Sequence, residues 1–179
     1  MRRADLAHLL RAAARIADPE ILVIGSQAIH GAFAEHDLPP LAMVSREADI
    51  AFWNDEQDLL ADRLDGAIGE LSMFDQTHGY YAQGVSVATA ILPEGWRGRV
   101  VPFEHVDAGE ARAHCLDPHD LALSKLVAAR EKDRDFVQAL LEANLLDAVI
   151  LDQRAESLPI TRIQISTIRR FLKRHLPTS

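Results

Sequence analysis

The sequence contains one cysteine, Cys115, among 179 residues. A single cysteine excludes an internal disulfide and a multi-cysteine zinc site, and we expect a cytoplasmic protein. Hydrophobic runs are also short, and none approaches the ~20 apolar residues that a membrane-spanning helix needs. No long apolar segment with a small-residue cleavage site follows the first residues, so we expect neither a signal peptide nor a membrane partner.

Closely spaced histidine pairs and an excess of positive charge are also missing. The eight histidines lack the His-x₃-His spacing of a transition-metal site. The net charge of −8 argues against a protein whose whole surface coats nucleic acid. However, residues 157–179 contribute +5 and contain no acid, which leaves −13 on the rest of the chain. This basic C-terminal segment suits contact with a phosphate backbone or an acidic partner, and the alternative interpretation is a solvated helix face.

The composition is that of a globular protein, with 48% hydrophobic and 26% charged residues. The length is sufficient for one substantial domain. Residues 1–115 mix helical and strand patterns, whereas residues 116–179 are helical throughout. We therefore expect an α/β core over 1–115 and a helical part over 116–179 that packs on this core as one structural unit.

Hydrophobic periodicity predicts the individual elements. Leu59 and Leu71 belong to the apolar stripe of one predicted helix. The predicted helices cover residues 4–17, 26–35, 55–71, 118–130, 132–144, 146–156 and 161–175. The predicted strands cover residues 21–24, 48–53, 80–81, 85–92 and 99–103, and residues 37–44 are a predicted loop. Short connections predict antiparallel pairing among the later strands.

A strand-to-helix turn is predicted at Gly25-Ser26, directly after the apolar run Ile21–Ile24. Glycine gives the backbone freedom for a tight turn, and serine is a good N-cap. The N–H groups and hydroxyl at such a helix start are suited to hold a triphosphate. The alternative interpretation is a plain turn followed by an N-cap without any ligand.

Two carboxylates, Glu47 and Asp49, stand two residues apart at the next predicted strand, and they share one face if this strand begins as early as Glu47. Carboxylate oxygens are the ligands that Mg²⁺ prefers, and a nearby cation such as Lys125 or Lys132 offsets the charge of departing pyrophosphate. The alternatives are edge-strand charges that favour solubility, a lysine that extends from an apolar helix face to water, and a surface mesh of ion pairs over residues 130–135.

In order and spacing, these motifs resemble the bacterial nucleotidyltransferase-superfamily proteins of the AbiEii/MenT type, and most closely their small uncharacterised relatives. The family pattern has Gly-Ser or Gly-Gly after a strand, then a Thr/Ser-x-Asp-x-Asp strand, then a helical lysine with an aspartate one to two turns later. The resemblance covers about residues 20–140. The matching segments are Gly25-Ser26, Ser45-Arg46-Glu47-Ala48-Asp49, residues 79–96, residues 117–126 and residues 130–135.

The resemblance implies an α+β fold, with a minimal mixed and mainly antiparallel sheet flanked by helices and a helical C-terminal part that closes the cleft. It implies transfer of a nucleoside monophosphate from an NTP with Mg²⁺. For the toxin members of the family, the acceptor is RNA, notably the 3′ end of tRNA, and a neighbouring antitoxin protein restrains the enzyme.

The resemblance also implies roles for individual residues. Gly25 and Ser26 would bind the triphosphate, and Lys125 would contact the nucleotide phosphates. Asp133 would be a further active-site acid, able to help deprotonate the acceptor hydroxyl. The remaining two implied catalytic residues, which would hold the metal, are Glu47 and Asp49.

The sequence departs from the family pattern at two points. Its first carboxylate is Glu47 rather than aspartate, and residues 85–90 provide no third carboxylate. Either the metal site is leaner, or the protein keeps the fold for binding and regulation without catalysis. Transfer of the nucleotide to a small molecule or a protein is the remaining alternative.

Overall fold

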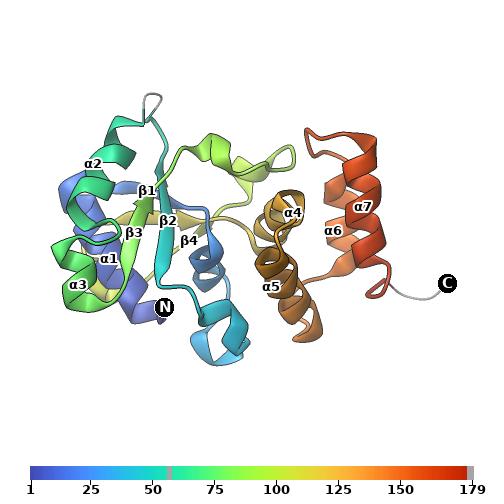
Figure 1. Cartoon of the computed structure of the whole chain (residues 1–179), viewed down its shortest axis with the longest axis horizontal. Helices are drawn as coiled ribbons and strands as arrows, with labels where there is room; N and C mark the ends of the chain where they lie inside the picture. Colours follow the sequence, from blue (N-terminus) through green and yellow to red (C-terminus); the bar gives the residue numbers. More distant parts are fainter. Residues whose placement is uncertain (56–57, 177–179) are drawn as a thin grey trace.

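The computed structural model describes residues 1–55 and 58–176, which form a five-stranded mixed sheet flanked by helices (Figure 1). The strand order is β3-β2-β1-β5-β4. The strands are β1 (Glu20–Val23), β2 (Glu47–Phe52), β3 (Tyr81–Gly84), β4 (Val101–Pro102) and β5 (Arg112–Cys115). β1 pairs antiparallel with β2, as does β4 with β5, while β1 and β5 are parallel, as are β2 and β3. The predicted α+β class with a mixed sheet is confirmed.

Helices precede, interrupt and follow this sheet. The α-helices are α1 (Arg3–Ile16), α2 (Leu59–Ile68), α3 (Met73–His78), α4 (Pro118–Ala128), α5 (Glu131–Glu142), α6 (Ala148–Ala155) and α7 (Arg162–Leu172). The short 3₁₀ helices are η1 (Ser26–Gly31), η2 (Glu35–Asp37), η3 (Pro40–Met43), η4 (Val87–Thr89), η5 (Trp96–Gly98) and η6 (Val106–Ala108). Within the described ranges, no helix is both long and apolar enough to cross a membrane.

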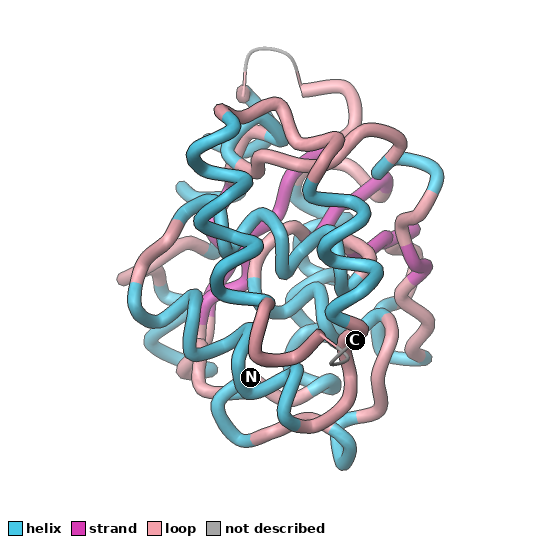
Figure 2. The backbone as a smooth tube through the Cα atoms, turned by 90° about the vertical axis from the view of Figure 1, so that its right-hand side faces the viewer, coloured by secondary structure: helices cyan, strands magenta, loops and turns pink. Residues whose placement is uncertain are grey.

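The C-terminal helices stand on one side of the sheet (Figure 1). α4 and α5 lie between the sheet and the outer pair α6 and α7 (Figure 1). Seen from that end, helices stand in front of the strands (Figure 2). α4 contacts η1, and α5 contacts η3, so both inner helices reach the segments that follow β1 and precede β2.

One hydrophobic cluster runs through the described chain. It includes Leu6 and Leu10 of α1, Leu22 of β1, and Leu123 and Leu140 of the C-terminal helices, all with 0% exposure. Burial of each such side chain contributes about 1.5–3 kcal/mol. The C-terminal helices therefore share their core with the sheet, which holds α4 and α5 in a defined position.

The strongest local patterns gave correct elements. The helices predicted over 4–17, 118–130, 132–144, 146–156 and 161–175 correspond to α1, α4, α5, α6 and α7, and the strands predicted over 21–24 and 48–53 correspond to β1 and β2. The predicted helix over 55–71 corresponds to α2, with residues 56–57 outside the described part. Leu59 and Leu71 do not belong to its buried stripe, because they are 63% and 79% exposed.

Three predictions about the middle of the chain were wrong. Residues 26–31 form the 3₁₀ helix η1, with Gly25 rather than Ser26 at its N-cap, and the chain is not helical again until η2 begins at Glu35. Residues 85–92 form a loop with η4, because the Ser86 side chain accepts a hydrogen bond from the Ala88 N–H and favours a local turn over a strand ladder. The predicted loop over 37–44 contains η3.

Strand pairing in the second half of the sheet also differs from the expectation. β3 is parallel to β2 because α2 and α3 connect the two strands, and a helical connection of this length permits a parallel crossover. β5 was not predicted, since Arg-Ala-His-Cys shows little strand preference. It forms because β1 and β4 pair with it on both sides.

Candidate functional site

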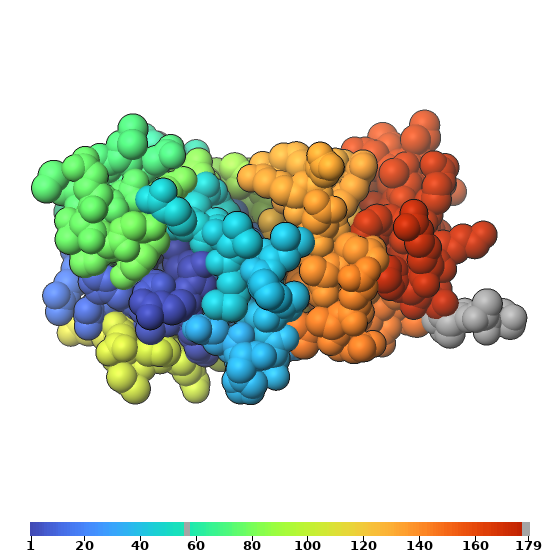
Figure 3. Space-filling view, turned by 60° about the horizontal axis from the view of Figure 1, so that its bottom comes forward, coloured from blue at the N-terminus to red at the C-terminus, as the bar shows by residue number. Residues whose placement is uncertain are grey.

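A cleft of about 840 Å³ lies where β2 and the turn after β1 face α4 and α5. Figure 3 shows the segment around residues 35–50 in direct contact with the surface of α5. All the candidate site residues from the sequence line this one cleft: Gly25, Ser26, Glu47, Asp49, Lys125 and Asp133. Tertiary structure therefore brings together groups from three separate segments, while their chemical roles stay predictions.

Gly25 leaves space for the carboxylate of Asp49. A Cβ atom on Gly25 would lie 1.5 Å from Asp49 Oδ2 and 2.5 Å from its Cγ. The backbone of Gly25 is extended, with φ −87° and ψ −165°, a conformation that any residue adopts. The conformational freedom expected from the sequence is therefore not what this position requires. It requires the absence of a side chain.

The acids Glu47 and Asp49 lie on the same face of β2, as their alternation predicts. Burial, followed by repulsion from Glu47, raises the pKa of Asp49 to about 6. The hydroxyl of Tyr81 donates a hydrogen bond of 3.2 Å to Glu47 Oε2 from the adjacent strand. The two carboxylates thus form a strained like-charge pair, which a bound cation would relieve.

Gln83 is the side chain beside Asp49 on the neighbouring strand. In the parallel β2–β3 ladder, Glu47 is opposite Tyr81, and Asp49 is opposite Gln83. Gln83 is exposed and lines the cleft. Sequence reasoning missed it, because residues 82–84 lay outside the predicted strands 80–81 and 85–92, and a third acid was sought in residues 85–90. Recognition of β3 as a partner of β2 would have identified it.

Lys125 and Arg130 converge on Asp133. Lys125 Nζ lies 3.1 Å from Asp133 Oδ1, and Arg130 Nε lies 2.5 Å from Asp133 Oδ2. Burial by itself raises the pKa of Asp133, but the hydrogen bond from Arg130 and the ammonium of Lys125 outweigh burial and hold the pKa below its usual value. The segment from α4 to α5 thus places two cations, partly neutralised by Asp133, opposite Glu47 and Asp49.

Ser26 and Lys132 offer polar groups that are not engaged within the described residues. The Ser26 hydroxyl lines the cleft without a hydrogen bond to the described part of the chain. Lys132 also lines the cleft and is exposed, without an ion pair there. η1 has only six residues, so its dipole is weak, and any anion held at this turn depends on individual N–H groups and the hydroxyl.

The donor atoms on β2 and β3 suit a hard cation. Glu47 and Asp49 offer carboxylate oxygens, and Gln83 offers an amide oxygen, which are the ligand types of Mg²⁺. No group of three or more His, Cys, Asp or Glu side chains is arranged for a metal ion within residues 1–55 and 58–176. The residues present therefore fit a magnesium site with two acidic ligands and a neutral third one.

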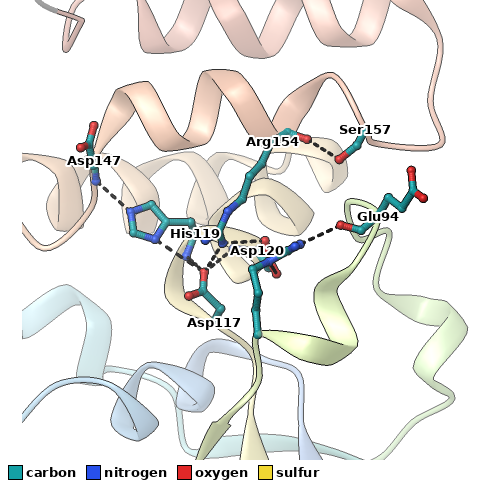
Figure 4. A network of polar contacts seen from close by, with 8 residues as sticks. Glu94, Asp117, His119, Asp120, Asp147, Arg154 and Ser157 are labelled. Carbon is teal, nitrogen blue, oxygen red and sulfur yellow. Dashed lines mark hydrogen bonds and ion pairs between the residues drawn. The ribbon is translucent and has the colours of Figure 1, made fainter.

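A buried ion-pair network fixes the N-terminus of α4, about two turns before Lys125. Asp120 is 0% exposed and pairs with Arg99 at 2.8 Å and with Arg154 of α6 at 2.9 Å. Arg154 also reaches Asp117, the N-cap of α4, and Asp147 donates its N–H to His119 (Figure 4). The network connects α4, α6 and the loop before β4, which keeps the cleft wall in position.

The comparisons with known proteins agree with this geometry at the level of the family. Residues 4–172 match the family described as "Nucleotidyltransferase of unknown function (DUF6036)". No curated protein and no solved structure matches the chain. The match spans both the sheet and the C-terminal helices, and it includes every residue of the candidate cleft named above. The chain belongs to this nucleotidyltransferase family.

Proposed function

We propose that the protein transfers a nucleoside monophosphate from an NTP to an acceptor hydroxyl in this cleft. The observation that carries the proposal is the convergence of an acid pair, an available hydroxyl and a cluster of cations on one cavity. Nucleotidyl transfer needs these three components to hold a divalent ion, a triphosphate and the developing negative charge. Family membership supports the same class of reaction.

In this proposal, Glu47, Asp49 and Gln83 hold Mg²⁺. The ion, when bound, neutralises phosphate charge and polarises the phosphoryl oxygen. Tyr81 keeps the Glu47 carboxylate on the cleft side through its hydrogen bond. Gly25 provides the space that lets Asp49 stand against the turn after β1. These residues together prepare one wall of the site before any ligand enters.

The opposite wall would hold the triphosphate. Lys125 and Lys132 offer ammonium groups, and Ser26 offers a hydroxyl from the side of the sheet. The two ion pairs of Asp133 keep Lys125 and Arg130 oriented in the absence of a nucleotide. With its pKa lowered, Asp133 is a weak proton acceptor, so we assign it a positioning role rather than that of a general base.

We propose RNA, with the tRNA 3′ end as the first choice, as the acceptor. The support is the basic helix at the edge of the cleft. Arg162, Arg170, Lys173 and Arg174 are exposed on or just after α7, and Gln164 of the same helix lines the cleft. Such a helix attracts a phosphate backbone although the whole chain is acidic. A toxin restrained by a cytoplasmic antitoxin, as in the proteins that the sequence resembles, is the corresponding biological role.

Incubation of the protein with each labelled NTP, Mg²⁺ and total tRNA tests the proposal. We expect label to appear in RNA, and Asp49→Ala should abolish it. Asp62→Ala, a change to an exposed acid of α2, is the matched control and should retain the wild-type rate. Label in a small molecule or a protein would keep the reaction and reject the RNA acceptor.

A binding module without catalysis is the second candidate. The observation that favours it is the acid pair without a third acid among the described residues. Absence of label from RNA, protein and small molecules with all four NTPs would select this alternative. In that case, partner binding should be independent of Mg²⁺ and unchanged by Asp49→Ala.

A further inference from the structure

A second hollow of about 520 Å³ adjoins the candidate cleft, and Val85, Ala90 and Ile91 line both cavities. Trp53 and Trp96 line the second hollow. Their rings are stacked, with centroids 5.9 Å apart and planes inclined by 10°. The loop over residues 85–91 is therefore a common wall between the acid pair and an aromatic surface.

The aromatic surface lies on the same face of the sheet as the acid pair. Asp49 and Ala51 alternate along β2, and Trp53 continues this alternation just past its end. The edge of His114 contacts Trp53, and His114 lies in the same row across the sheet as Leu22 and Ala51. Trp53 follows Asp49 by four positions, which corresponds to about 13 Å along an extended chain.

Arg97 gives the hollow a planar cation. Its guanidinium lies 4.7 Å from the centroid of Trp96 and 5.6 Å from that of Trp53. Arg97 is exposed and makes no ion pair with the described residues. A planar ring with π-electron density can stack on these rings or on the guanidinium, since both surfaces favour such a partner.

The charged groups of the hollow disfavour a phosphate there. Asp55 and Asp58 line it together with Arg97. The carboxylate of Asp55 accepts hydrogen bonds from the N–H groups of Leu60 and Ala61, both at 2.9 Å, and so is already engaged at the start of α2. A neutral aromatic ring fits this environment better than an anion.

We propose that the second hollow binds a nucleobase of the acceptor, stacked against the cluster that Trp53 and Trp96 form with the Arg97 guanidinium over their rings. The acceptor then extends along β2 past Val85 and Ile91, with its reactive hydroxyl directed toward Asp49. That this base belongs to the acceptor rests on the proposed function, whereas the nucleobase site itself does not. The base belongs either to a free nucleotide or to a nucleic-acid strand, and the experiment below separates these two sources.

Tryptophan fluorescence tests the site directly. Trp53 and Trp96 are the two tryptophans of the chain, so intrinsic emission reports on this hollow. The protein is titrated, without Mg²⁺, with AMP, with a single-stranded adenylate octamer, and with ribose 5-phosphate as the probe without a base. We expect saturable quenching by at least one base-containing probe and none by ribose 5-phosphate. Equal responses to all three probes, or no response, would overturn the proposal.

Variants locate the binding through the anisotropy of a fluorescein-labelled octamer. Loss of one base–aromatic stack corresponds to about tenfold weaker binding, which we expect for Trp96→Ala and Arg97→Ala. Arg15→Ala, which removes an exposed arginine of α1, is the charge-matched control and should bind like the wild type. Trp96→Phe replaces Trp96→Ala if circular dichroism shows that the alanine variant is unfolded. Two outcomes would reject this site. One is an equal loss of octamer affinity in Arg97→Ala and Arg15→Ala. The other is wild-type octamer affinity in both Arg97→Ala and the folded Trp96 variant.

The same measurements identify the source of the base. Equal affinities for AMP and the octamer indicate a free nucleotide, whereas an octamer that binds more than tenfold tighter indicates a strand. Both results support the nucleobase site. Because neither assay requires Mg²⁺, an NTP or turnover, a negative labelling experiment leaves this inference standing, and a negative titration leaves nucleotidyl transfer standing.

Discussion

Gly25 and Asp49 occupy one small volume at the centre of the cleft. A side chain on Gly25 would begin 1.5 Å from Asp49 Oδ2, and the neighbouring Ile24 N–H donates a 3.0 Å hydrogen bond to the backbone carbonyl of Asp49. The end of β1 therefore packs directly against Asp49 of β2. The glycine of the Gly-Ser motif and the second acid of the strand motif act as one unit in this fold.

Gly25→Ala should destabilise the protein and displace the acid. The new methyl group overlaps the Asp49 carboxylate, and we expect a loss of about 1–3 kcal/mol in the free energy of unfolding together with weaker Mn²⁺ binding. Urea denaturation and calorimetric titration measure the two effects. Gly66→Ala is the control, and its effect on the free energy of unfolding should have the opposite sign. It removes an exposed glycine from α2 and should stabilise the protein by about 0.5–1 kcal/mol. Wild-type metal affinity in Gly25→Ala would contradict the shared-space interpretation.

Asp49→Asn should stabilise the metal-free protein at pH 7.5. The pKa of Asp49 rises from 3.8 to about 6 on folding, so the ionised carboxylate opposes folding above pH 6, and this penalty disappears as the pH falls toward 3.8. We expect a gain on the order of 1–2 kcal/mol for the variant at pH 7.5 and almost none at pH 4. Unfolding in the presence of EDTA across this pH range checks the prediction, and a gain that is independent of pH would exclude titration of Asp49 as its cause.

Gln83→Glu should tighten metal binding and weaken the metal-free fold. The substitution places a third carboxylate beside Asp49 in the β2–β3 ladder, which adds charge attraction for a divalent ion and repulsion in its absence. We expect about tenfold tighter Mn²⁺ binding by calorimetry and a lower melting temperature in EDTA. Gln153→Glu, a change on α6 at an exposed side chain without a hydrogen bond to the described residues, should alter neither value. Unchanged affinity in Gln83→Glu would remove Gln83 from the metal site.

Asp120→Ala should be among the most damaging single substitutions away from the cleft. It leaves Arg99 and Arg154 without the buried carboxylate that both of them contact, and loss of one partner in such a buried pair costs about 3–5 kcal/mol. Thermal unfolding is the measurement, with Asp62→Ala on the surface of α2 as the control that should barely change the melting temperature. A loss comparable to that of the control would mean that the network does not hold α4.

Local patterns were sufficient for a large part of this protein. The period of α1 and of the C-terminal helices, the apolar run of β1 and the alternation in β2 are visible in windows of a few residues, because helix and strand each impose their own spacing on buried side chains. The same local information pointed to Gly25, Glu47 and Asp49, whereas Lys125 and Asp133 were assigned through the family resemblance. All five residues line one cleft.

Contacts between segments that are distant in the sequence determined the rest of the fold and of the candidate site. Tyr81 and Gln83 acquire their places beside Glu47 and Asp49 only because β3 crosses over and pairs in parallel with β2. β5 becomes a strand because its backbone N–H and C=O groups find partners in β1 and β4, although its own residues show little preference for one. Likewise, Trp53 and Trp96 stack because the loop after β3 folds back over the sheet. Local sequence sets which conformations each segment favours, whereas hydrogen-bond pairing and burial between segments select which of them meet.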